Sequence, residues 1–131
     1  MRPRGPAALV LAAALALSAC EGDPPPAPDR REDRWLAAVD GLCGALTSAQ
    51  DPEAAEGAFQ DRSHATLHEI AGELQQVDRQ AAAELLEAKN LVEADFAEDA
   101  TPSELEADLT SLIAATVDGL QALGVASPGC A

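Results

Sequence analysis

Aromatic side chains are scarce in this chain, which limits the core that it can build. Its 131 residues include no tyrosine, and the only aromatics are Trp35, Phe59 and Phe96. Alanine and leucine dominate the remaining apolar residues, so large side chains contribute little to any core. About a hundred residues are nevertheless enough for one domain. The sequence predicts a single, thin domain.

Cationic residues are also few. Eight lysines and arginines stand against 23 aspartates and glutamates, which gives a formal net charge of -15. Nucleic acids and anionic phospholipid surfaces repel such a chain, so the composition argues against nucleic acid as a partner. Two interpretations of the acidity stay open: a solubilising surface of dispersed charge, or a surface for a basic or cationic partner.

The motifs that usually carry catalysis are missing. The sequence has no GxSxG elbow for a nucleophilic serine and no glycine-rich phosphate loop. Gly41 and Gly44 lie in a helical segment, where small residues permit close packing of helices. Ser63 precedes His64, but a catalytic serine also needs a third group to orient its base, and an oxyanion site. We expect that the protein is not an enzyme.

The first nineteen residues have the organisation of a secretory signal peptide. Arg2 and Arg4 give a positive start, a short apolar run follows, and small residues precede Cys20. The apolar run is too short to span a bilayer. We predict that residues 1–19 are a signal peptide.

The segment Leu17-Ser18-Ala19-Cys20 resembles the lipobox of bacterial lipoproteins. The resemblance implies transfer of a diacylglyceryl group to the Cys20 sulfur, cleavage before Cys20, and acyl chains such as palmitate on the mature protein. It implies a location in the bacterial cell envelope, lipid-anchored to a membrane and facing the extracytoplasmic side. Two acyl chains are enough for stable anchoring, whereas one is marginal.

A proline-rich stalk follows the lipobox. Residues 21–28 read EGDPPPAP, and such a proline run favours extended polyproline II without a core. We predict that residues 20–28 form the lipidated cysteine and stalk and that residues 29–131 form the folded domain. Loss of Arg2 and Arg4 with the leader leaves six cationic residues against 23 acidic ones, a net charge of -17.

Lipidation of Cys20 leaves Cys43 and Cys130. An even number of cysteines in an oxidising compartment predicts one disulfide bond. Their wide spacing, without a CxxC motif, argues against a redox site or a zinc cluster. On the chain-entropy model, closing so long a loop contributes roughly 4–5 kcal/mol of stability.

The folded domain has apolar residues at helical spacing and predicts an all-α fold, a small helical bundle. The first helix begins at Asp29 and ends near Gln50. A short helical turn follows, with Asp51 as its N-cap, and Gly57 ends or loosens it.

The last helix has the clearest start signal. Thr101 and Glu104 form a capping box around a proline at the first helical position. Gly124 marks the C-terminal stop. Thr116 has the phase of the buried face, and the carbonyl of Leu112 is the expected acceptor for its hydroxyl.

The middle of the domain carries the strongest pattern, an apolar stripe from Leu67 to Phe96 with a mean spacing of about 3.6 residues. It predicts one long helix from about Asp61 to Ala97. Asp78 falls inside the stripe, where an unpaired charge is costly. The matching phase on both sides favours an unbroken helix; the alternative is a break at which Asp78 caps a new helix.

These alternatives give two topologies. With three main helices that alternate in direction, Cys43 lies at the same end of the bundle as the C-terminal tail, which favours three helices. With four helices, the last one ends at the opposite end. The seven-residue tail would then stretch roughly 23 Å back along the first helix to bring Cys130 to Cys43.

Asp61, His64 and His68 are candidate metal ligands. On one helix the two histidines project from the same face one turn apart, and Asp61 joins their strip. Such a DxxHxxxH strip provides three ligands for zinc, copper or nickel. The competing interpretation is structural, because Asp61 and Ser63 are good N-caps and histidine is ordinary at a helix surface.

Together these observations predict a non-catalytic, envelope-anchored lipoprotein that acts as a binding or scaffolding module. Besides the membrane, its expected partner is an unknown envelope protein or a cationic ligand. The alternative is an envelope metal-binding protein that uses the DxxHxxxH strip. Trp35, beside Arg31 and Arg34, is interpreted as a core residue, with an exposed binding anchor as the second possibility.

Overall fold

The computed structural model describes Gly22 and residues 28–131 of the chain. The predicted signal peptide, Cys20 and most of the predicted stalk lie outside the described residues. Within the described part the chain is entirely α-helical and contains no strand, which confirms the all-α prediction. Its five helices are α1 (Pro28–Thr47), α2 (Pro52–Arg62), α3 (His64–Val77), α4 (Arg79–Ala97) and α5 (Pro102–Ala122).

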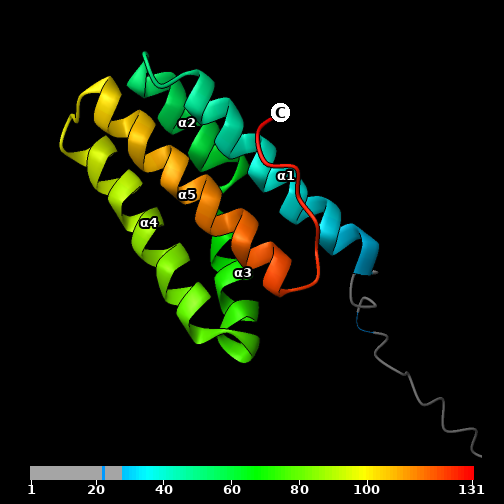
Figure 1. Ribbon diagram of the computed structural model, residues 1–131. Coiled ribbons are helices and arrows are strands. Elements are labelled where there is room, and N and C mark those ends of the chain that lie inside the picture. The colour runs from blue at the N-terminus through cyan, green and yellow to red at the C-terminus, as the bar shows by residue number, and fades with distance from the viewer. Residues whose placement is uncertain (1–21, 23–27) are drawn as a thin grey trace, which may run out of the picture.

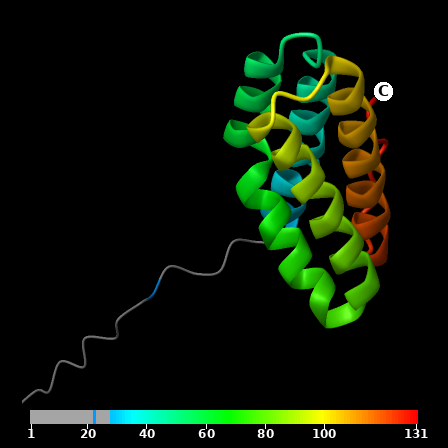
Figure 2. The same ribbon diagram turned by 90° about the vertical axis from the view of Figure 1, so that its left-hand side faces the viewer.

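The helices form a bundle in which the chain makes four passes (Figure 1). Helix α2 reverses the direction of α1, and α3 continues the same pass, as the side view in Figure 2 also shows. Helix α4 returns beside α3, and α5 runs back beside α4 and α1. The α1–α2 and α4–α5 connections therefore lie at one end of the bundle, whereas α1 begins near the other end.

The preferred prediction of one unbroken helix from about Asp61 to Ala97 is wrong, and the alternative break at Asp78 is confirmed. Asp78 has extended backbone angles and caps α4, because its carboxylate accepts a 3.0 Å hydrogen bond from the backbone N–H of Ala81. This bond satisfies an orphan donor of the helix, so a charge that would be costly inside the stripe becomes stabilising at a cap. Val77, expected in the stripe, is consequently 64% exposed at the end of α3.

A second break lies at Ser63, between α2 and α3. The Ser63 hydroxyl is buried and donates a 2.7 Å hydrogen bond to the carbonyl of Ala38 on α1. Gly41 permits this approach, since a Cβ there would meet the Ser63 oxygen and lie 2.7 Å from Cβ of Arg62. Gly57 is expected to end or loosen the short second helix, and an end there is wrong, because α2 continues through Gly57 to Arg62.

The first helix ends at Thr47, somewhat before the predicted end near Gln50. Three other predicted signals at the ends of helices are confirmed. Asp51 accepts a hydrogen bond from the N–H of Ala54 at the start of α2. Thr101 and Glu104 form the complete capping box of α5. After α5, Gly124 has a φ of 81°, a left-handed conformation that glycine adopts without strain.

The core is a single cluster that all five helices enter. Trp35 is only 2% exposed, which confirms its interpretation as a core residue and excludes an exposed anchor. The hydroxyl of Thr116 is buried and donates to the carbonyl of Leu112, as expected. The core's largest wholly buried apolar side chains, apart from Phe59, are leucines, isoleucine and valine: Leu42, Leu67, Ile70, Leu74, Leu85, Leu105, Leu109, Leu112, Leu120 and Val39.

The predicted disulfide joins Cys43 to Cys130, whose Cα atoms are 5.4 Å apart and whose sequence separation is 87. The three-helix topology favoured by the position of the cysteines is wrong. Helix α5 ends at the opposite end of the bundle, and the C-terminal tail returns beside α1, as the four-helix alternative required (Figure 1). Buried Val125 anchors the start of this tail.

Candidate functional site

The predicted metal strip is divided between two helices. Asp61 lies near the end of α2, and the break at Ser63 places both histidines on α3. The imidazole rings of His64 and His68 do lie together, with centroids 5.1 Å apart. Among the described residues, however, no group of three or more His, Cys, Asp or Glu side chains is arranged to hold a metal ion.

The histidines instead face a buried lysine on α4. Lys89 is 2% exposed and donates a 2.7 Å hydrogen bond to Oε1 of Glu93. The same oxygen lies 2.9 Å from Nε2 of His64. Burial lowers the pKa of His68, and the positive charges of Lys89 and His64 add to this effect against the opposing charge of Glu93. Burial alone would raise the pKa of Glu93, but its hydrogen bond to Lys89 and the charges of Lys89 and His64 lower it.

This cluster holds α3 against α4 and leaves little for a metal to bind. The carboxylate nearest to His64 is already bonded to an ammonium group, and that ammonium would repel a second cation at close range. Sequence reasoning missed Lys89, although its spacing from Leu85 and Val92 placed it on the buried side of the stripe.

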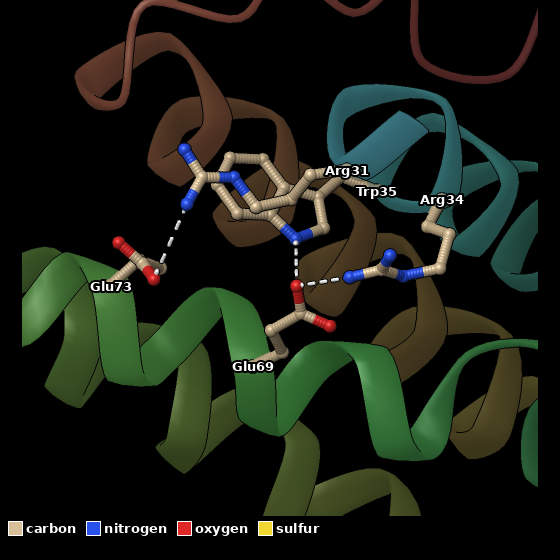
Figure 3. A network of polar contacts seen from close by, with 5 residues as sticks. All are labelled: Arg31, Arg34, Trp35, Glu69 and Glu73. Carbon is tan, nitrogen blue, oxygen red and sulfur yellow. Dashed lines mark hydrogen bonds and ion pairs between the residues drawn. The ribbon is translucent and has the colours of Figure 1, made fainter. Parts of the chain in front are cut away.

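A second polar network joins α1 to α3 (Figure 3). One oxygen of Glu69 accepts hydrogen bonds from Nε1 of Trp35, at 3.2 Å, and from Arg34, at 2.6 Å. Arg31 stacks over the Trp35 ring at 5.0 Å and pairs with Glu73 at 3.6 Å. The network satisfies the indole N–H at the edge of the core, so the tryptophan and both arginines serve helix packing.

Acidic side chains are concentrated where the α1–α2 and α4–α5 connections meet. We call this region the acidic end. It gathers carboxylates from both connections and from the adjoining parts of α2, α4 and α5: Asp51, Glu53, Glu56, Asp95, Glu98, Asp99, Glu104, Glu106 and Asp108. The chain has no lysine, arginine or histidine between residues 47 and 61 or after Lys89, so neither connection contributes a cation.

Asp95 and Asp108 make a pair of carboxyl groups across the α4–α5 interface at the acidic end. One oxygen of Asp95 is buried and has no hydrogen-bond partner among the described residues. Burial raises the pKa of Asp95 to about 6, and the charge and hydrogen bond of Asp108 add to this effect, with smaller contributions from Glu104 and Glu98. Burial and the negative charges of its neighbours together thus oppose ionisation of Asp95.

The arginines lie mainly toward the other end of the molecule. Arg30, Arg31 and Arg34 occupy the first turns of α1, where the chain from the predicted stalk joins the bundle. The domain is therefore electrically polar along its length. Sequence reasoning gave the overall acidity but not this segregation, because only the fold brings two distant connections to one end.

Two further observations concern the chain as a whole. No helix in the described part combines the length and apolar character that a membrane crossing requires. No protein-family model matches the chain, and no curated protein or solved structure is similar enough to it to be matched.

Proposed function

We propose that this protein is a non-catalytic lipoprotein of the bacterial cell envelope that presents its acidic end to a cationic partner. Lipid on Cys20 anchors it on the extracytoplasmic side of a membrane. The predicted stalk joins the bundle where α1 begins, near the end that is opposite the acidic end. The acidic end is therefore the end farther from the point where the stalk joins the bundle.

The observation that carries the proposal is the segregation of charge. Carboxylates from two distant connections meet at one end of the bundle, and neither connection contributes a cation. Burial and the negative charge of Asp108 together raise the pKa of Asp95. A ligand with several positive charges relieves the repulsion among these carboxylates when it binds, so its charge contributes to affinity and to the rate of encounter. A membrane surface of anionic lipid cannot supply such a ligand.

The non-catalytic part of the proposal rests on how the candidate reactive groups are engaged. The Ser63 hydroxyl is buried and donates to the carbonyl of Ala38 rather than to His64. His64 lies against Glu93, whose carboxylate is bonded to Lys89. The alternative of a metal-binding function through Asp61, His64 and His68 has less support, because Asp61 lies on a different helix.

The test is a calorimetric titration of the unlipidated, oxidised Cys20→Ala protein with a peptide of ten lysines at low salt. In one variant, Glu56→Gln, Glu98→Gln and Asp99→Asn remove three exposed charges from the acidic end. We expect about a tenfold loss of affinity, since three exposed ion pairs contribute roughly 0.5 kcal/mol each. Asparagine suits position 99, where φ is 55°.

The matched control removes three exposed charges elsewhere: Glu32→Gln, Glu84→Gln and Glu87→Gln. Its net charge equals that of the first variant, so overall acidity is held constant. We expect the control to lose less than half as much affinity as the variant of the acidic end. Binding of the peptide to both variants should weaken with added salt. Equal losses in the two variants would mean that the acidic end has no special role and would contradict the proposal.

A further inference from the structure

A shallow groove lies between α1, α5 and the C-terminal tail. It has a volume of about 410 Å³, and its lining includes Leu46, Ile113, Val117 and Cys130. A second hollow of about 490 Å³, lined by Ser103, Glu106, Ala107 and Thr110, adjoins it, since Thr110 lines both. Together they follow α5 from Ser103 to Asp118, a length of about 22 Å at the rise of an α-helix.

The groove carries acidic groups at both ends and apolar groups between them. Glu106 belongs to the acidic end, and exposed Asp118 lies twelve residues further along α5. Between them the lining is made by small or apolar side chains and one threonine. No cationic residue lines either hollow.

We propose that this groove is the docking surface for a basic amphipathic helix of a partner protein. The apolar face of that helix packs on Leu46, Ile113 and Val117, as in other cases where a helix lies in a hydrophobic groove. Lysine or arginine near each end of its bound segment, about 18 Å apart, pairs with Glu106 and Asp118. The inference rests on the proposed function and names the class of its cationic partner.

Length and charge select this occupant. Two connected hollows over about 22 Å fit an elongated element better than a compact small molecule. The small side chains of Ala107 and Ala114 leave room for a helix to approach α5 closely. A symmetric pairing of two copies through α5 is disfavoured, because α5 carries no cation and would bring Glu106 and Asp118 against like charges.

The probe is a synthetic helical peptide of alanine and leucine with two lysines near each end, about twelve residues apart. Calorimetry measures its binding to the oxidised Cys20→Ala protein. Ala114→Arg places a long side chain in the groove, and its positive charge repels the lysines of the peptide. We expect at least about a tenfold loss of affinity. Ala65→Arg, on the exposed surface of α3, adds the same residue elsewhere and should change affinity less than about twofold.

The outcomes separate this inference from the proposed function. If Ala114→Arg binds as tightly as Ala65→Arg while the variant with three charges removed from the acidic end loses binding, the groove is wrong and the acidic end stands. If none of these variants weakens binding, both are wrong. Circular dichroism checks the helix content of Ala114→Arg. Should that variant misfold, Ala107→Arg applies the same test from the adjoining hollow.

Discussion

Asp95 is the residue whose protonation is most directly tied to the fold. Its pKa in the folded protein is raised to about 6 from an ordinary value of 3.8, because burial and the carboxylate of Asp108 disfavour its charge. Between these values the native state holds a proton that the unfolded chain has released. The contribution of Asp95 to stability is therefore fully present below about pH 4 and is lost as the pH rises through about 6.

Asp95→Asn should accordingly raise the free energy of unfolding at pH 7 and have little effect at about pH 4. The amide cannot ionise, so it removes the charge repulsion at the α4–α5 interface and can donate to Asp108. Urea denaturation at a series of pH values measures both effects, with Asp118→Asn, an exposed change away from this pair, as the control. Destabilisation by Asp95→Asn at pH 7 would show that the charged carboxylate is favourable in the fold.

The histidine pair gives a second prediction at this scale. Zinc titrated into the oxidised protein should show no binding in the low micromolar range, because Lys89 occupies the carboxylate of Glu93 and Asp61 lies on another helix. His68→Ala provides the comparison. Tight binding that this substitution abolishes would restore the metal-binding alternative.

At the scale of single helices, Asp78 decides where α3 ends and α4 begins. Asp78→Ala removes the cap on the N–H of Ala81 and should destabilise the protein by about 1 kcal/mol. Gln76→Ala, an exposed change near the end of α3, is the control, and chemical denaturation measures both. An unchanged or increased stability of Asp78→Ala would mean that the sequence prefers a continuous helix and that the cap has little effect.

The helices were predictable where a local signal specified them. The capping box at Thr101, the cap at Asp51 and the glycine at position 124 each act within a few residues. Periodicity also found most of the core but misjudged the long middle helix. The periodicity of apolar residues shows which face of a helix is buried, and here it keeps its phase across a one-residue interruption. It therefore could not distinguish an unbroken helix from a cap at Asp78.

The break at Ser63 could not be predicted locally, since its hydroxyl bonds to Ala38, 25 residues away. The same limit applied to the candidate site. Sequence reasoning identified the histidines but not the pairing of Lys89 and Glu93 beside them, which depends on the packing of α4 against α3. The part of the groove that Cys130 lines likewise depends on the return of the tail beside α1.

At the scale of the whole molecule, the disulfide compensates for a core with few large side chains. Replacing both Cys43 and Cys130 by serine frees a loop of 87 residues and should lower the free energy of unfolding by roughly 4–5 kcal/mol on the chain-entropy model. Thermal denaturation of the oxidised protein measures the loss, and Cys20→Ser provides the control. A double variant as stable as the control would show that helix packing alone holds the tail and the bundle.

The central claim concerns the whole molecule as well: lipid on Cys20 anchors the bundle in the envelope and presents its acidic end outside the cytoplasm. The most direct test is the intact mass of the protein extracted from the membranes of a bacterium that expresses the full chain. The account predicts a chain from Cys20 to Ala131 that carries a diacylglyceryl group, whereas Cys20→Ala lacks the lipid and, once residues 1–19 are removed, leaves the membrane fraction. A chain that retains residues 1–19, or an unmodified Cys20, would contradict it.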